Sequence, residues 1–250
     1  MRAFLTLVRR ELAIYFISPS GYVLISAVLF LVGISFVQLV DGLMAEPTDI
    51  PITEGFYTTW YFWLVMLLAS PLITMRSFAQ EKASGTFETL MTTPISDLQV
   101  VLSKFAGALL FFCALWLPLG GIILIVRHYT DDQSVFHPGT LAGTYLGILM
   151  LGAFFMSLGT FTSSLTRSQI VASITSLAMG MLLFLMSYRS FVSPLDNDGF
   201  MEILRHVSII DHMHDSVRGI IDTRHLVFYL STTFLFLFLT FKVVESRRWK

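Results

Sequence analysis

The charged side chains that could take part in chemistry gather in one polar stretch between two apolar runs, RSFAQEKASGTFETLMTTPISD, residues 76–97. The mixed charges of Glu81, Lys82 and Glu88 suit docking against another protein, where they would set register more than affinity. A charge run is also usual on a solvated loop. Composition alone therefore leaves a docking segment and a plain linker equally open.

A second group of chemically capable side chains is His212-x-His214, flanked by Asp211 and Asp215, with His206 nearby. Histidine and carboxylate side chains are ligands for zinc and similar metals. In a helix, however, residues two positions apart point away from each other, which prevents chelation. We therefore expect an ordinary polar helix face and no metal site.

The elements that must position these groups belong to a membrane protein. Hydrophobic residues make up 55% of the 250 positions and charged residues only 13%, well away from the balance of soluble domains. Six apolar segments have the length of membrane-spanning helices: residues 22–40, 56–75, 100–126, 140–163, 169–187 and 226–244. Their interiors carry no ionisable residue, which argues against a proton- or sodium-coupled carrier.

The distribution of basic residues predicts the orientation. With the N-terminus inside, most of the 16 Lys and Arg residues fall on the cytoplasmic side, as the positive-inside rule requires. The loop after the first span holds Asp41, Glu46, Asp49 and Glu54 and no basic residue. We therefore expect both termini and the polar stretch to be cytoplasmic.

Two regions outside the spans are also predicted to be helical. Residues 1–18 read as an interfacial helix on the inner leaflet, with a polar face of Arg2, Thr6, Arg9 and Arg10 and an apolar face of Phe4, Leu5, Val8, Leu12 and Tyr15. Residues 188–225 form the largest external loop, and apolar residues at helical spacing predict one or two short helices within it. The aromatics Tyr57, Trp60, Tyr61 and Trp63 read as a membrane-interface belt.

Small residues at four-residue spacing occur in the fourth and fifth spans: Gly143, Gly147, Ala172, Ser176 and Gly180. Such faces let helix backbones approach closely, so they predict a tight bundle and no particular chemistry. The single cysteine, Cys113, lies in an apolar run and reads as packing, without a disulfide or thiolate metal cluster. The net charge of −1 gives no indication of nucleic acid as a partner.

The polar stretch itself predicts a helical hairpin. Residues 76–83 continue the second span as a helix, Ser84 and Gly85 break it, and residues 86–92 form a short second helix. Phe87, Leu90 and Met91 occupy the apolar side of that helix, and Pro94 stops it. Ser96 and Gln99 form a capping-box pattern that opens the third span.

At these residues the chain resembles the membrane subunits of type 2 ABC exporters (the ABC-2 membrane family), whose coupling helix has the form E-K-x-x-G-T-x-E-x-L followed by a proline. The matching residues here are Glu81, Lys82, Gly85, Thr86, Glu88, Leu90 and Pro94. The end of the chain, with RGIIDTR and ESRRW, is similar to the gliding-motility-type permease subgroup. His225 departs from that subgroup, which carries an acidic residue there.

The resemblance implies one ABC type 2 transmembrane domain over residues 1–250, in a bacterial inner membrane. It implies a dimer with a second permease subunit, identical or different, bound to two ABC ATPase subunits, and it leaves a periplasmic or membrane accessory subunit open. The coupling set would be Glu81, Lys82, Gly85, Thr86, Phe87, Glu88, Leu90, Met91 and Pro94.

The chain has no G-x-x-x-x-G-K-[ST] loop, the motif that cradles nucleotide phosphates. We therefore expect no enzyme activity and no cofactor in this chain, with ATP and Mg²⁺ held by the partner ATPase. The substrate stays unidentified. A membrane scaffold that anchors a complex and moves nothing is the main alternative, and an intramembrane enzyme ranks last because the spans hold no catalytic cluster.

Overall fold

The computed structural model describes residues 2–45, 52–91, 95–129, 138–192 and 206–246. Within these ranges every regular element is a helix, and no strand occurs. Six helical stretches are long and apolar enough to cross a membrane, which confirms an all-α integral membrane fold. The spans are α2 (Pro19–Ala45), α4 (Trp60–Thr74) continued by α5 (Ala79–Ser84), α7 (Asp97–Tyr129), α8 (Pro138–Leu165), α9 (Gln169–Val192) and α12 (Thr223–Ser246).

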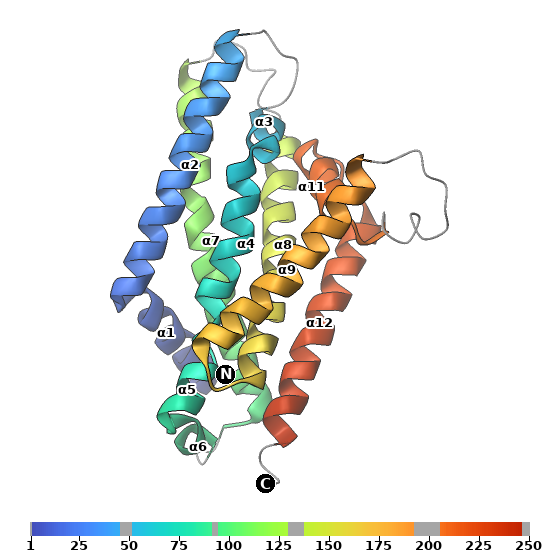
Figure 1. The fold of residues 1–250 in the computed structure, drawn as a ribbon. Helices are drawn as coiled ribbons and strands as arrows, with labels where there is room; N and C mark the ends of the chain where they lie inside the picture. The colour runs from blue at the N-terminus through green and yellow to red at the C-terminus, as the bar shows by residue number, and fades with distance from the viewer. Residues whose placement is uncertain (1, 46–51, 92–94, 130–137, 193–205, 247–250) are drawn as a thin grey trace.

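The core of the bundle is built around α4 and α8, with α2 and α12 at the outside (Figure 1). The most apolar windows of α4 and α8 are 72% and 61% buried within the chain, against 22% for both α2 and α12. The outer helices keep large apolar side chains exposed, among them Phe30 on α2 and Phe234 on α12. Such surfaces suit lipid or another membrane subunit, not water.

Close backbone approach explains the central place of α8. A Cβ atom at Gly152 would lie 2.2 Å from the Phe112 ring, and one at Gly159 would lie 2.0 Å from Thr74 Oγ1. Ser70 on α4 also donates to the Phe155 carbonyl across 2.9 Å. Glycine at these two positions therefore lets α7 and α4 pack directly on the α8 backbone.

The small residues singled out in the sequence lie at contacts within the chain. A Cβ at Gly143 would lie 2.5 Å from the Ser216 carbonyl oxygen, and one at Gly147 would lie 2.8 Å from Ser216 Cβ. On α9, Ala172 and Ser176 are buried and a Cβ at Gly180 would meet Phe155 at 2.9 Å. Gly143 and Gly147 therefore let a helix of the loop before α12 pack closely on α8. Ala172, Ser176 and Gly180 lie where α9 packs on the core.

Helix α1 (Arg2–Ile17) lies at the end of the bundle where α12 finishes (Figure 1). Its expected apolar face is only partly right. Val8 is buried and Tyr15 stacks on Phe111 of α7 at 4.8 Å between ring centroids, but Leu5 is 64% exposed and Glu11 is buried. The face differs because α1 packs on α7, so a protein surface and not a bilayer alone selects the buried residues.

The second span begins later than residue 56. A separate short helix, α3 (Ile52–Thr58), precedes it, and Thr59 has extended backbone angles of φ −70° and ψ 142° that end α3 before α4 begins. The aromatic belt is wrong for Tyr57 and Trp63, which are buried in the core, while Trp60 is 73% exposed. Burial of Tyr57 is tolerated because its hydroxyl donates to the Ile210 carbonyl across 2.7 Å.

Helix α11 (Ile209–Val217) closes the end of the bundle opposite α1, and we call this end the distal end (Figure 1). The hydroxyl of Ser208 caps it by accepting from the Asp211 amide at 3.3 Å. Arg218 donates two bonds, of 2.7 and 3.1 Å, to Glu54 of α3. A short helix in the loop before the last span is thus confirmed, while residues 193–205 of that loop lie outside the described ranges.

Candidate functional site: a braced coupling segment

The polar stretch forms two short helices at a sharp corner, α5 (Ala79–Ser84) and α6 (Thr86–Met91); we call residues 79–91 the coupling segment. Gly85 makes the corner with a left-handed φ of 73°, a conformation that costs glycine nothing and other residues about 1 kcal/mol or more. Ser84 and Thr86 hydrogen-bond each other across it at 2.8 Å. The corner turns α6 away from the line of the second span.

The expected continuous helix over residues 76–83 is wrong. Helix α4 ends at Thr74, residues 75–78 form turns, and α5 starts at Ala79. The hydroxyl of Ser163 on α8 accepts from the amides of Phe78 and Ala79, both at 3.1 Å, and donates to the Met75 carbonyl at 3.2 Å. A fully buried side chain from another span thus satisfies the backbone groups that the interruption leaves open.

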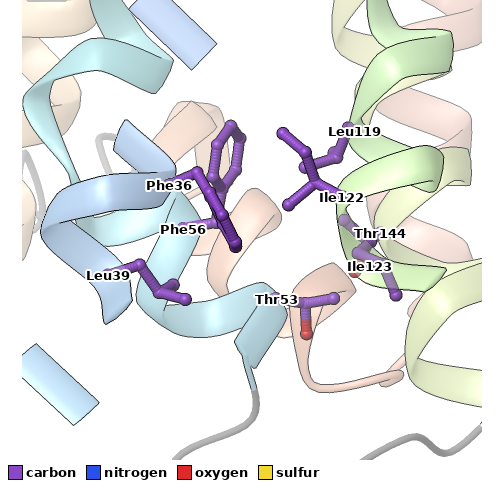
Figure 2. A pocket seen from close by; sticks show the side chains of 8 residues that line it. All are labelled: Phe36, Leu39, Thr53, Phe56, Leu119, Ile122, Ile123 and Thr144. Atoms are coloured by element: carbon purple, nitrogen blue, oxygen red, sulfur yellow. The ribbon is translucent and has the colours of Figure 1, made fainter. Parts of the chain in front are cut away.

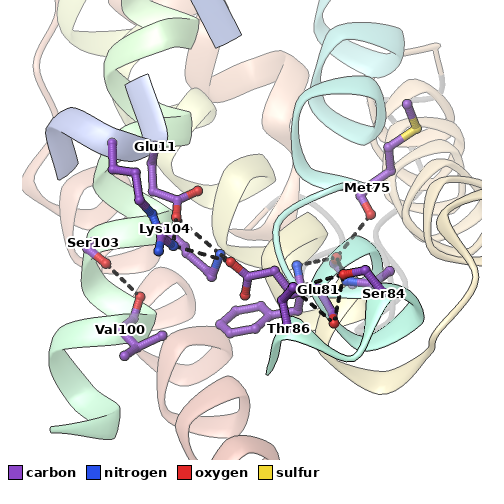
Figure 3. Close-up of polar contacts among 12 residues, drawn as sticks. Glu11, Met75, Glu81, Ser84, Thr86, Val100, Ser103 and Lys104 are labelled. Atoms are coloured by element: carbon purple, nitrogen blue, oxygen red, sulfur yellow. Dashed lines mark hydrogen bonds and ion pairs between the residues drawn. The ribbon is translucent and has the colours of Figure 1, made fainter. Parts of the chain in front are cut away.

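Four charged side chains, three of them largely buried, brace the segment (Figure 3). Lys104 Nζ of α7 lies 2.8 Å from Glu81 Oε1 and 3.2 Å from Glu11 Oε1. Arg10 Nη2 reaches the same two oxygens, at 3.2 Å and 2.8 Å respectively. We call these four residues the charge cluster; it joins α1, α5 and α7, and its formal charges balance.

The contribution of the charge cluster to stability depends on how deeply its side chains are buried. Side-chain exposure is 2% for Lys104, 7% for Glu11 and 18% for Glu81, whereas Arg10 is 44% exposed. Removing one partner of a buried pair leaves an uncompensated charge, which costs about 3–5 kcal/mol. Burial lowers the pKa of the Arg10 guanidinium, but its hydrogen bond to Glu11 and the negative charges of Glu11 and Glu81 outweigh this and raise the pKa overall.

Two more contacts fix the segment to the bundle. Lys82 Nζ donates to the Ser164 carbonyl at the end of α8 and lies over the Phe87 ring, 5.4 Å from its centroid. Phe87 of α6 packs against the fully buried Phe78 in a small apolar cluster that includes Val244 of α12. The coupling segment therefore contacts α1, α7 and α8, and Phe87 shares an apolar cluster with Val244 of α12.

The predicted coupling residues divide by the side they face. Glu81, Lys82 and Phe87 turn toward the chain itself, whereas Thr86 and Glu88 are exposed together with Gly85. The side chains of Leu90 and Met91, and Pro94 as a whole, lie outside what the structure describes. Of the expected docking charges, Glu88 is exposed, whereas Lys82 is buried and Glu81 is partly buried against the chain itself. The cap at the start of α7 is confirmed, since Ser96 Oγ accepts from the Gln99 amide at 3.3 Å.

Sequence reasoning missed Glu11 and Ser163. A signal for Glu11 was present, because it follows the buried Leu7 by four residues and so lies on the same helical face; an acid there requires a cation from another element. Ser163 has no comparable signal, because hydroxyl residues are common in α8 and only the packed structure places one beside the interruption.

An apolar crevice at the distal end is too small to hold a substrate (Figure 2). It is lined by Phe36, Leu39, Thr53, Phe56, Leu119, Ile122, Ile123 and Thr144, and its volume is about 10 Å³, barely room for one water. Its two hydroxyls are already engaged, with the Val217 and Thr140 carbonyls. Among the described residues, no group of three or more His, Cys, Asp or Glu is placed to hold a metal.

The fold and this site define a multi-pass helical membrane protein with a short, braced helical segment at one end. A family model described as ABC-2 family transporter protein matches residues 34–244. The chain therefore belongs to the ABC-2 transporter family. It is the membrane permease component of an ABC transporter, a transport component and not itself a catalyst, which works with an ABC ATPase in a lipid bilayer. A search of curated protein sequences finds no match to the chain.

Proposed function

We propose that this chain is the permease of an ATP-driven exporter, in which an ATPase docks on the exposed side of the coupling segment and closure of the ATPase tilts the spans. The charge cluster is the observation that supports this most directly. Because Lys104 and Glu81 are joined at 2.8 Å and nearly buried, movement of α5 is carried into α7, and through Glu11 into α1, as a rigid body. A plain linker needs no such bracing.

The same proposal extends to the assembly. Two permease subunits, identical or different, bind two copies of the ATPase, which hold ATP and Mg²⁺. The chain lies in a bacterial inner membrane with both termini cytoplasmic, the orientation supported by the excess of Lys and Arg on that side. The end of the sequence supports the gliding-motility-type subgroup, and an accessory subunit on the periplasmic side fits that assignment.

The test is co-purification with the ABC ATPase, with ATP hydrolysis measured in the complex. Glu88→Arg reverses an exposed charge on α6, so we expect it to weaken ATPase binding without altering the melting temperature. Glu245→Arg is the matched control, since Glu245 is exposed at the same end but belongs to α12. Gly85→Pro should uncouple hydrolysis from the permease by destroying the corner. If both Glu88→Arg and Gly85→Pro left complex formation and ATPase stimulation intact, the coupling role would be wrong.

A further inference from the structure

Arg76 is a partly buried arginine in the turns between α4 and α5. Its side chain reaches across to the joint between α1 and α2, where Nη1 donates to Ser20 Oγ at 2.6 Å and to Ser18 Oγ at 3.4 Å. Within the described ranges, no carboxylate lies within ion-pair distance of this guanidinium. Its positive charge is therefore not neutralised by those residues, whereas the charges of the charge cluster balance one another.

Arg76 and the two serines have accessible hydrogen-bond donors left over. Nη2 of Arg76 has accessible surface and no partner among the described residues, whereas Nε is buried. The hydroxyl oxygens of Ser18 and Ser20 lie 2.7 Å apart, so one of their two protons is used between them and the other is free to donate. Ser20 is exposed. An anion with several acceptor oxygens can therefore reach both a guanidinium donor and a hydroxyl donor.

An exposed apolar strip on α4 leads to the turn that holds Arg76. Leu64, Leu68 and Leu72 share one helix face and are 40%, 42% and 44% exposed, although α4 belongs to the most buried span of the bundle. We call these three residues the leucine strip. At 1.5 Å per residue it covers about 12 Å, most of the roughly 15 Å of hydrocarbon in one leaflet. Helix α4 lies between α2 and α9 and contacts both (Figure 1), so the strip is a lipid-facing surface flanked by two spans.

The level of Arg76 in the bilayer follows from its serine partners. Ser20 lies at the start of the first apolar span, which begins at Pro19. Arg76 therefore lies at the boundary where hydrocarbon gives way to lipid headgroups. A charged side chain at this depth is costly unless it is paired, and phosphate groups are the anions that a bilayer supplies at this level.

We propose that an anionic phospholipid binds here, with its phosphodiester on Arg76 and the serine pair and one acyl chain along the leucine strip. Nη2 and the free hydroxyl proton each donate to a phosphate oxygen, and hydrogen bonds between a guanidinium and phosphate are charge-assisted and strong. The single negative charge of the phosphodiester neutralises Arg76. The site goes beyond the proposed export function, because the lipid is held and not moved, and binding requires neither ATP nor the partner ATPase.

The test is native mass spectrometry of the full chain, delipidated in detergent and titrated with one ligand at a time. The probes are phosphatidylglycerol, diacylglycerol with the same chains but no phosphate, and glycerol 3-phosphate without chains. We expect saturable binding of phosphatidylglycerol, about tenfold or more tighter than either of the others. Equal binding of diacylglycerol would mean that the leucine strip alone holds the chains, and equal binding of glycerol 3-phosphate would mean a site for free phosphate; either result overturns the proposal.

A matched pair of variants assigns the phosphate contact. Arg76→Gln keeps a polar side chain but removes the charge, so we expect the affinity for phosphatidylglycerol to fall about tenfold or more, while that for diacylglycerol stays the same. Lys242→Gln is the control, because Lys242 is an exposed cation at the same end of the bundle but belongs to α12. Unchanged affinity for phosphatidylglycerol in Arg76→Gln overturns the proposal.

The wild-type chain locates the site without any substitution, in case Arg76→Gln fails to fold. Phosphatidylglycerol with a photoreactive group near the start of one acyl chain is bound at one equivalent and irradiated, and the crosslinked residues are identified by peptide mass spectrometry. We expect crosslinks at Leu68 and Leu72. Crosslinks confined to other spans would overturn the proposal.

Discussion

Lys104 of α7 and Glu81 of α5 form an ion pair of 2.8 Å, with the lysine side chain 2% exposed. The residues are 23 positions apart, and the coupling segment from Lys82 onward lies between them in the sequence. The pair therefore closes the segment into a loop anchored on the third span. Lys104 also pairs with Glu11 of α1, so ion pairs connect α1, α5 and α7 at this end of the bundle.

Lys104→Met should destabilise the protein strongly. It leaves the carboxylates of Glu11 and Glu81 buried with only the partly exposed Arg10, so we expect a loss of about 3–5 kcal/mol in the free energy of unfolding. The measurement is denaturant unfolding in detergent micelles. Lys242→Met is the control, because Lys242 and Glu245 form an exposed pair, 52% and 38% exposed, and such pairs contribute about 0–1 kcal/mol.

The double variant Lys104→Met/Glu81→Met tests the charge balance itself. It removes one charge of each sign and leaves Arg10 paired with Glu11 at 2.8 Å, so we expect it to be more stable than Lys104→Met alone. Stimulation of the partner ATPase should nevertheless fall, because α5 has lost its ionic link to α7. A double variant no more stable than the single one would show that packing of the lysine stem, and not charge, holds the segment.

Ser163→Ala should loosen the interruption between α4 and α5. The hydroxyl accepts from two amides and donates to one carbonyl, and leaving such buried groups unpaired costs about 1–3 kcal/mol. Hydrogen exchange at the amides of Phe78 and Ala79 should accelerate. Ser164→Ala is a close control: its hydroxyl bonds only the Phe161 carbonyl of its own helix, and Lys82 uses the Ser164 backbone, which the substitution keeps. Equal exchange rates in the two variants would contradict the role given to Ser163.

The sequence predicted the elements well and their partners poorly, for physical reasons. The bilayer thickness sets the length and hydropathy of a span, so the six spans follow from the local sequence pattern. The corner at Gly85 also follows from local sequence, because glycine readily adopts the left-handed conformation. The interruption after Thr74 does not, because Ser163 from a distant span compensates it. Tyr57 and Trp63 carry polar atoms typical of an interface, but Tyr57 finds a carbonyl on α11. Glu81 and Lys82 are predicted as docking charges from the sequence, and only the tertiary structure shows that they contact α7, α1 and α8 of the chain itself.

Gly159→Ala should weaken the contact between α4 and α8. A Cβ there would lie 2.0 Å from Thr74 Oγ1 and 2.8 Å from Thr74 Cβ, so the helices must separate or Thr74 must move, at a cost of about 1–3 kcal/mol. The check is the melting temperature in detergent. Gly33→Ala on α2 has nothing within 4 Å of the new methyl group and should leave the melting temperature unchanged or slightly raised.

The Glu54–Arg218 pair should make the distal end sensitive to acid. The hydrogen bond from Arg218 holds the pKa of Glu54 below its usual 4.5, despite the opposing effect of burial. A lowered pKa in the folded state contributes stability above the unfolded value and loses it as pH falls through the folded value. We expect Glu54→Gln to flatten the fall in melting temperature below about pH 4.5. Asp41→Asn, an exposed carboxylate of α2, should leave that slope unchanged.

Distance measurements between α4 and α9 distinguish an exporter from a scaffold. With Cys113→Ser as background, spin labels at Leu68 of α4 and Leu182 of α9 occupy exposed positions, so the labels should not disturb packing. An exporter driven through the coupling segment must change the tilt of its spans, so the distance distribution should shift or broaden during ATP turnover with the partner ATPase. The shift should disappear with Gly85→Pro, because the corner no longer transmits the movement. A distribution identical with and without ATP turnover would support the scaffold and overturn the exporter.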